Sequence, residues 1–406
     1  MLYKKKQKLI FLLSFLTLFL SFYLNEDGYG TGASGDFHDT WGYIENILKN
    51  NFKIINPLNW TLHFPFHYYI LSFFYLIISD QTYLRLFFCS LSFFVPYLFI
   101  IIYKKINNNL SYDFSIALGS IIFFIPAFRY TSIWANNNIT STIFFLNSIF
   151  FFYFWKNSYK KNYSLYFILF QVFFLTLACY TRQYYCVFFI YFFYFYFKKL
   201  CHSDLIIVIF FTFLLSLPGL FYIYYFSELL TKLSISTSFS NSLLGNSSML
   251  SIYLIPIILI NFFLNKKIFN KKEVIFLILF SFFLTLILSF NFDYSNWLGG
   301  GIIFFITNSI LKNNFLFYCS SALSFAVLLF IAKENVPNSL LVLILLFTFS
   351  GNAVYQRYFE PLFYIVYFLL INSKTSSIFK TNIKSVYFLF SFYLIYYSCA
   401  LLRVIH

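Results

Sequence analysis

Carboxylates crowd into one stretch near the start of the chain. Of the 13 acidic residues in the sequence, those between residues 26 and 45 are Glu26, Asp27, Asp36, Asp39 and Glu45. In a helix that starts near residue 37, Asp36, Asp39 and Tyr43 would follow one face at spacings i, i+3 and i+7. Asp36 would also cap that helix by accepting hydrogen bonds from its free backbone N–H groups. A carboxylate held in this way can remove a proton from an incoming hydroxyl group, although a solvated, acid-rich loop would have the same composition.

Two arginines share a local pattern that suits an anionic ligand. The first stands in Tyr180-Thr181-Arg182-Gln183-Tyr184-Tyr185, and the second in Tyr355-Gln356-Arg357-Tyr358-Phe359-Glu360-Pro361. The planar fork of a guanidinium group matches a phosphate, whereas a lysine offers only a point charge. Gln and aromatic side chains beside it could bind the hydroxyls and the ring of a sugar. The alternative is that these residues only anchor span ends at the level of lipid headgroups.

Composition excludes most classes of soluble protein. Of the 406 residues, 61% are hydrophobic and only 10% are charged, whereas soluble domains carry about 25% charged residues. The net charge of +15 comes from short basic clusters between apolar runs, as in the cytoplasmic loops of membrane proteins. These features exclude a soluble enzyme, a nucleic-acid binder and a disordered scaffold. The six cysteines are far apart, so we interpret them as small apolar residues of helices, forming neither disulfides nor a zinc site.

Hydropathy predicts an all-α polytopic membrane protein with about 13 transmembrane helices. The predicted spans lie near residues 9–24, 83–103, 114–128, 139–155, 164–179, 185–197, 205–224, 250–264, 274–290, 315–332, 338–351, 360–372 and 384–403. Placing every lysine cluster in the cytoplasm puts the amino terminus inside and the carboxyl terminus outside. The shorter runs 66–79 and 299–311 are then interfacial or re-entrant, and Gly299-Gly300-Gly301 would permit a sharp turn or a close backbone approach.

The same threading places all the arginines at the outer face and divides the chain in a simple way. We expect a single transmembrane domain over residues 1–406, with no separate soluble domain. The first outer loop, residues 25–82, would carry the acids and the interfacial helices. A second outer loop would cover residues 225–249, which are rich in Ser and Asn. His63 and His67 could bind a metal, but we favour headgroup anchoring because Pro65 breaks a regular helix between them.

The order of these motifs resembles the GT-C superfamily of membrane glycosyltransferases, in particular the protein O-mannosyltransferases and the lipid A aminoarabinose transferases. The resemblance is carried by Asp39-x-x-x-Tyr43, by Pro65 with the pair Tyr68–Tyr69, and by Arg85 at the start of a long apolar span. Thr40 stands where that family commonly has Glu, and Phe64 replaces the first Pro of its motif. These departures leave open whether Asp39 or Asp36 is the catalytic residue.

The resemblance implies a glycosyltransferase with a GT-C-like fold. A sugar would move, with inversion, from a polyprenyl-phosphate donor to a hydroxyl acceptor on a glycan, lipid or protein, with Asp39 or Asp36 as general base. The donor phosphate would be bound by Arg357, Arg182 and Arg85, and the sugar or acceptor by Tyr43, His38, Gln183, Gln356, Tyr358 and Glu360. No cofactor is required, no metal ligands are assigned and no nucleic acid is involved; a divalent cation bridging the acids is the alternative. We expect the bacterial cytoplasmic (inner) membrane, with lipids around the protein and the active site on the outer side.

Two other functions fit parts of this pattern. An outer-facing polysaccharide polymerase or ligase would also use outer arginines, but the acids here crowd behind the first span instead of a late loop. A flippase or transporter of lipid-linked sugars would place ionisable groups near the bilayer midplane. Almost every charge in this chain maps to a span end or a loop, which favours the transferase. The sequence does not indicate which sugar is moved or which acceptor receives it.

Overall fold

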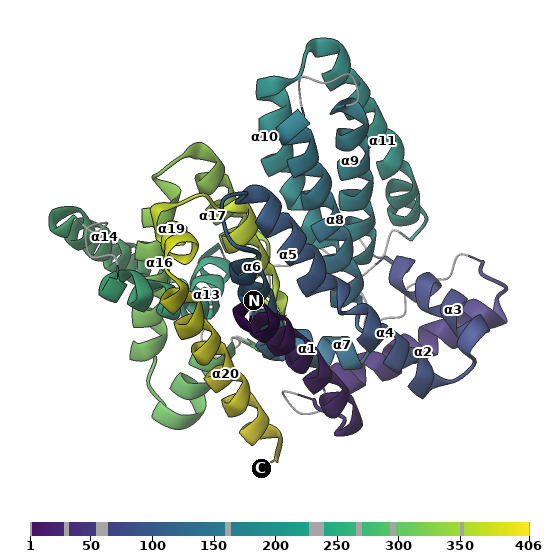
Figure 1. Ribbon diagram of the computed structural model, residues 1–406, viewed down its shortest axis with the longest axis horizontal. Coiled ribbons are helices and arrows are strands. Elements are labelled where there is room, and N and C mark those ends of the chain that lie inside the picture. Colours follow the sequence, from purple (N-terminus) through teal and green to yellow (C-terminus); the bar gives the residue numbers. More distant parts are fainter. Residues whose placement is uncertain are drawn as a thin grey trace. The chain divides into compact units, whose positions relative to one another are not determined.

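The chain forms two compact units, of which unit 1 comprises Met1–Ser234 with Leu394–His406 and unit 2 comprises Ile235–Tyr393. The computed structural model in Figure 1 describes residues 2–27, 32–53, 64–158, 164–226, 239–264, 270–292, 298–299, 301–349 and 353–405. The predicted all-α class is confirmed for these residues. The strand pairing among them is a parallel contact of β1 (Leu298–Gly299) with β2 (Ala353–Val354).

Unit 1 is helical throughout its described residues. Its elements are α1 (Leu2–Tyr23), α2 (Gly32–Lys49), α3 (Phe66–Ile78), α4 (Gln81–Leu91), α5 (Phe94–Ile106), α6 (Tyr112–Ile121), η1 (Ile122–Phe124), α7 (Pro126–Ile133), α8 (Asn137–Ser158), α9 (Ser164–Thr181), η2 (Gln183–Val187), α10 (Phe188–Lys199) and α11 (His202–Tyr225). The carboxyl-terminal helix α20 (Ile383–Ile405) contributes its last residues to this unit. Helices α8 and α9 pack along their lengths, with α11 on the other side of α9 (Figure 1).

Helix α2 begins earlier than the sequence predicts. The carboxylate of Asp27 accepts hydrogen bonds from the backbone N–H groups of Ala33 and Ser34, each at 3.1 Å. Asp27 therefore satisfies the free donors at this helix start. Asp36 lies inside α2, so its predicted role as the cap is wrong. This leaves the Asp36 side chain available for contacts with other helices.

Eight helices of the described residues are long and apolar enough to cross a membrane, or ten if two bent pairs each count as one span. The eight are Gln81–Ile106, Asn137–Ser158, Ser164–Thr181, His202–Tyr225, Ser240–Leu264, Lys271–Ser289, Phe315–Ala332 and Ile383–Leu401. The bent pairs coincide with the predicted spans 114–128 and 360–372. The count of 13 is not confirmed, because 185–197 and 338–351 become 12-residue helices, below the limit of about 17.

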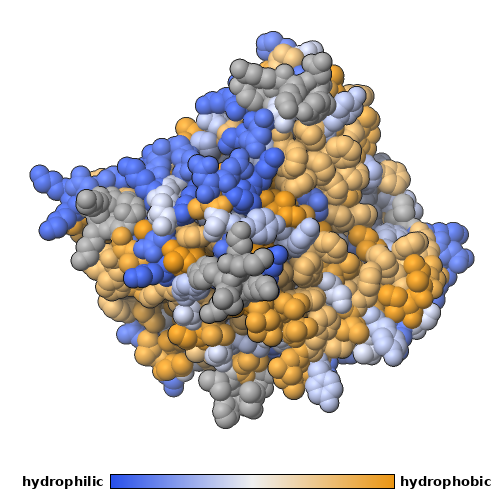
Figure 2. All heavy atoms as spheres, in the orientation of Figure 1, coloured by the Kyte–Doolittle hydropathy of each residue, from blue (hydrophilic) through white to orange (hydrophobic). Residues whose placement is uncertain are grey.

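Apolar side chains on the outside of the helices indicate contact with lipid. Helix α11 leaves only 17% of its apolar window buried, and hydrophobic residues dominate its side of the surface in Figure 2. Its exposed side chains include Ile206, Phe210, Phe213, Leu217, Leu220 and Phe221. Exposed apolar area on this scale needs a nonpolar environment. The chain is therefore an integral membrane protein, with α3 and Gly301–Leu311 too short to span; whether those two lie at an interface stays a prediction.

Lysines gather at one end of unit 1. The ammonium of Lys105, in the last turn of α5, lies 4.7 Å from the ring of Phe154 in α8. The ammonium of Lys156, near the end of α8, lies 5.4 Å from the ring of Phe195 in α10. Three carboxyl-terminal helix ends thus meet, as the predicted threading requires of helices running in one direction. The opposite end of α8, about 33 Å away, carries no lysine.

Unit 2 contains α13 (Phe239–Leu264), α14 (Lys271–Ser289), β1, α15 (Gly301–Phe305), the π-helix η4 (Ile306–Leu311), α16 (Phe315–Ala332), α17 (Val336–Phe347), β2, η5 (Gln356–Tyr358), α18 (Leu362–Ile365), the π-helix η6 (Val366–Leu370), α19 (Lys374–Thr381) and the first part of α20. Lys333 at the end of α16 forms an ion pair with Glu273 in α14. Residues 239–249, predicted as part of a loop, form the start of α13, and their described side chains are buried. The rest of that predicted loop, 227–238, lies outside the described residues.

Candidate functional site

Asparagine 136 joins an acid of α2 to an arginine that follows α9. Its Nδ2 donates to Asp36 Oδ2 at 3.2 Å. Its Oδ1 accepts from Arg182 Nη2 at 3.5 Å and from the backbone N–H of Asn138 at 3.1 Å. Asn136 therefore caps α8 and also lies between a carboxylate and a guanidinium group. Two predicted site residues that are 146 positions apart in sequence thus meet through one amide.

Arg182 is held in place before its charge meets any ligand. Its side chain is 4% exposed, and its Nε donates to Asn137 Oδ1 at 2.7 Å. The backbone is extended at Arg182, between the end of α9 and the short helix η2. This break directs the side chain toward the start of α8. Arg182 lies at the end of α8 that is opposite Lys156.

Two stacked tyrosines complete this group. The rings of Tyr43 and Tyr68 are 4.6 Å apart and inclined by 3°, and both are buried. Burial raises the pKa of Tyr68, and Tyr43 raises it further, whereas the nearby Arg182 acts in the opposite direction and Asp36 and Asp39 add smaller increases. Tyr68 therefore keeps its proton and can donate a hydrogen bond. We use the name acid–arginine cluster for Asp36, Asp39, Tyr43, Tyr68, Asn136 and Arg182.

His67 fixes the turn that carries Asn136. Its Nε2 lies 3.0 Å from the Ala135 carbonyl oxygen and its Nδ1 lies 3.0 Å from Thr140 Oγ1. A carbonyl can only accept, so Nε2 carries the proton and Nδ1 accepts from the threonine. The ring is 1% exposed, so the predicted headgroup anchoring of His67 is wrong. Ala135 has a positive φ of 46°, a costly conformation for a residue with a side chain. His63 lies outside the described residues.

The remaining predicted residues of unit 1 differ in exposure. Asp39 and His38 are exposed on α2, and Asp39 makes no hydrogen bond or ion pair with the described residues. Arg85 stacks over Trp134, with its guanidinium carbon 3.6 Å from the ring centroid, and donates to the Ile133 carbonyl at 3.1 Å. It thus supports the segment just before Asn136.

Gln183 borders a cavity instead of the acids. The cavity has a volume of about 370 Å³ and lies among α9, η2 and α11. Its lining is mainly apolar and includes Phe64, Tyr180, Cys179, Cys186, Phe189 and Leu220. Gln183 directly follows Arg182 in the chain, so the cavity adjoins the acid–arginine cluster along the backbone. A long apolar chain next to a charged group is the kind of ligand that this arrangement suits.

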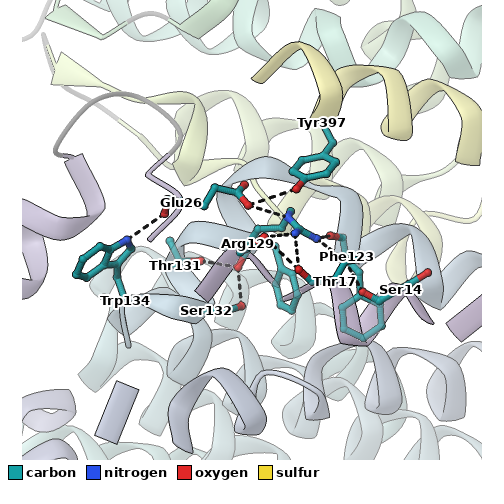
Figure 3. Close-up of polar contacts among 11 residues, drawn as sticks. Ser14, Thr17, Glu26, Phe123, Arg129, Thr131, Ser132, Trp134 and Tyr397 are labelled. Carbon is teal, nitrogen blue, oxygen red and sulfur yellow. Dashed lines mark hydrogen bonds and ion pairs between the residues drawn. The ribbon is translucent and has the colours of Figure 1, made fainter. Parts of the chain in front are cut away.

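A second buried arginine, Arg129 in α7, makes a closed set of contacts (Figure 3). Its Nε lies 3.4 Å from Glu26 Oε2, and both side chains are almost fully buried. Its two terminal nitrogens donate to Thr17, to Ser21 and to the Phe123 carbonyl. The ring of Tyr397 lies 4.2 Å from the guanidinium carbon. These contacts join α1, α7 and α20 and leave the charge neutralised.

The predicted residues of unit 2 surround a buried acid. Glu360 accepts a hydrogen bond from Tyr253, and Gln356 Nε2 donates to the same tyrosine oxygen. Gln356 and Glu360 are 3% and 4% exposed. Arg357 is half-buried, with the rings of Tyr355 and Tyr358 at 5.2 and 5.9 Å from its guanidinium carbon. Gln356 and Glu360 thus contact protein groups within unit 2.

Gly301 allows this arrangement in unit 2. Its φ is +74°, and any side chain there would collide with Gln356 Oε1. The predicted close backbone approach in the triple-glycine segment is therefore confirmed at Gly301. Of the neighbouring segment singled out in the sequence, residues 293–297 lie outside the described residues.

Among the described residues, no three His, Cys, Asp or Glu side chains gather as a metal site would require, so the alternative of a bridging cation gains no support. No family model, curated protein or solved structure matches this chain. The likeness to GT-C transferases therefore stays a prediction from its motifs. Sequence reasoning missed Asn136 and Asn137; their signal was a run of three asparagines between two predicted spans, where amide side chains are expected to cap or bridge.

Proposed function

We propose that this protein is a membrane glycosyltransferase that takes its sugar from a polyprenyl-phosphate donor. The observation that supports this most is the contact of Asp36 with Arg182 through Asn136. A proton acceptor and a phosphate-binding cation within one small cluster are what such a transfer needs. The cluster lies at the end of α8 opposite the lysines, which we assign to the outer face of a bacterial cytoplasmic membrane.

In this mechanism a carboxylate of α2 accepts the proton of the acceptor hydroxyl. The hydroxyl oxygen then bonds to the anomeric carbon, and the bond from that carbon to the phosphate oxygen breaks with inversion. Arg182 stabilises the negative charge that develops on the departing phosphate. Tyr68 keeps its proton and donates a hydrogen bond within the cluster. Arg357 is proposed as a further phosphate ligand and Arg85 as a support for the segment before Asn136.

The two acids differ in what they can do. Asp39 is exposed and has no partner among the described residues, so an acceptor can reach it. Asp36 is half-buried and is oriented by Asn136. We assign the proton transfer to one of them and the orientation of the cluster to the other. The apolar cavity beside Gln183 would receive the first isoprene units of the donor.

Conservative substitutions test the assignment. Asp36→Asn and Asp39→Asn keep the shape of each side chain but remove its basicity. Removal of the general base should lower the transfer rate about 10²–10⁴-fold. The assay measures transfer of labelled sugar from a polyprenyl phosphate in proteoliposomes, with uptake of the labelled lipid as a parallel readout. Glu45→Gln is the matched control, because Glu45 is an exposed acid of the same helix.

The result separates the candidate functions. Full transfer activity in both aspartate variants would disprove the general-base role. Movement of the labelled lipid across the bilayer without transfer would indicate a flippase, and elongation of a glycan would indicate a polymerase or ligase.

A further inference from the structure

Two cysteines lie on either side of Arg182 in the chain and meet in space. Cys179 belongs to the last turn of α9 and Cys186 to η2. Their thiols form a hydrogen bond with each other. Both also line the cavity of about 370 Å³ that adjoins Gln183. The sequence gave no sign of this pairing, because the two residues are separated by a helix break whose geometry hydropathy does not reveal.

The two thiols differ in the way that a reactive pair needs. Cys179 is buried, whereas Cys186 is exposed. The hydrogen bond from the Cys179 thiol lowers the pKa of Cys186. An exposed cysteine with a lowered pKa has more of its reactive thiolate form, and a buried neighbour can then complete the exchange.

We propose that Cys179 and Cys186 are a redox pair that closes into a disulfide and so regulates access to the cavity beside Arg182. The oxidant is a disulfide, carried by an oxidised dithiol protein or by a small molecule. The thiolate of Cys186 attacks one sulfur of that disulfide and releases the other as a thiol. Cys179, after losing its proton, attacks the Cys186 sulfur and releases the second carrier thiol. One protein disulfide forms while one carrier disulfide is reduced.

The bond would change the segment that carries Arg182. A disulfide holds its sulfur atoms about 2.05 Å apart, closer than a hydrogen bond between thiols. Closing it draws η2 toward α9 and restrains the break between them, and the cavity lined by both cysteines becomes narrower. This consequence for the site rests on the proposed function, whereas formation of the disulfide does not.

The first experiment uses the purified full-length protein in detergent. It is treated with oxidised glutathione, free thiols are blocked with N-ethylmaleimide, and peptides are analysed by mass spectrometry. We expect a linked peptide pair containing Cys179 and Cys186 that has lost two hydrogen atoms and is reopened by dithiothreitol. The exposed residues Cys201 and Cys399 are internal controls and should be alkylated. Alkylation of both Cys179 and Cys186, or only a glutathione adduct on Cys186, would overturn the inference.

The second experiment measures binding of a fluorescent polyprenyl phosphate to the oxidised and the reduced protein. We expect binding at least about tenfold weaker after oxidation, and no such difference in Cys186→Ser. Equal binding in both forms, despite a formed disulfide, would overturn the regulatory part of the inference. Absence of binding in both forms would overturn the regulation and the proposed donor together, although the disulfide itself would stand.

Discussion

Arg129 and Arg182 are both buried arginines of unit 1, yet their surroundings differ. Arg129 contacts the carboxylate of Glu26 directly, and its nitrogens donate to protein oxygens on three sides. Arg182 reaches the carboxylate of Asp36 only through the amide of Asn136. The first arrangement neutralises the charge completely. The second leaves acid and arginine close but separate, so each can act on a ligand.

The difference shows how one residue type serves two purposes in an apolar protein. A buried ion pair that is fully hydrogen-bonded is destabilising mainly when one partner is removed. A bridged pair that retains separate charges has the separation that transition-state stabilisation needs. We therefore expect Arg129 substitutions to affect folding and Arg182 substitutions to affect activity.

The largest effect is expected from Arg129→Met. This change leaves Glu26 as a buried carboxylate without its cation, which costs about 3–5 kcal/mol of stability. Thermal unfolding in detergent, followed by loss of the monodisperse peak, measures it. The double variant Glu26→Leu with Arg129→Met removes both charges and should recover a large part of the loss. A single variant as stable as the parent would show that the pair is not buried as described.

The next effect concerns activity instead of stability. Arg182→Met should lower sugar transfer about 10²–10³-fold, because the departing phosphate loses its cation. Its melting temperature should fall less than that of Arg129→Met. Arg182→Lys keeps the charge but not the fork and should recover only part of the rate. Equal loss of stability in the variants of both arginines would erase the distinction drawn here.

A smaller effect is expected from Asn136→Ala, which removes the bridge but keeps both charged groups. A hydrogen bond to a charged group contributes about 1.5–3 kcal/mol, so the transfer rate should fall about tenfold or more. Asn136→Asp is informative beside it, because its carboxylate repels Asp36 while attracting Arg182. Transfer at the parental rate in both variants would exclude a positioning role.

The smallest effect is expected from Tyr397→Phe. Tyr397 donates to Glu26 Oε2 at 3.4 Å, and phenylalanine keeps the ring over Arg129. The loss should be about 0.5–1.5 kcal/mol of stability, with unchanged transfer. A larger effect on transfer than on the melting temperature would mean that the Arg129 contacts reach the site.

Sequence reasoning predicted the helical class because an apolar run cannot leave its backbone unsatisfied in lipid. It failed where polar residues sit inside helices. Asn246 in α13 donates to the carbonyls of Leu346 and Phe349, each at 2.7 Å. Such tertiary partners make a Ser- and Asn-rich segment stable as a buried helix, but hydropathy assigns it to a loop.

The candidate site was predicted in part for a similar reason. The acids of α2 and Arg182 were chosen by residue type, and the structure brings Asp36 and Arg182 together. Asn136 was missed because its role depends on the direction in which α8 leaves the preceding turn. That direction follows from the contacts of His67 with Ala135 and Thr140, which link positions far apart in the sequence.

The left-handed backbone at Ala135 has a consequence for how firmly the asparagines are held. Alanine tolerates this shape at a cost of roughly 1–2 kcal/mol, which the imidazole contact must offset. Glycine would accept the shape without strain but would also allow many others. The protein thus trades some folding energy for a turn with a single geometry, and the amide between acid and arginine is presented ready-made instead of being assembled when substrate arrives.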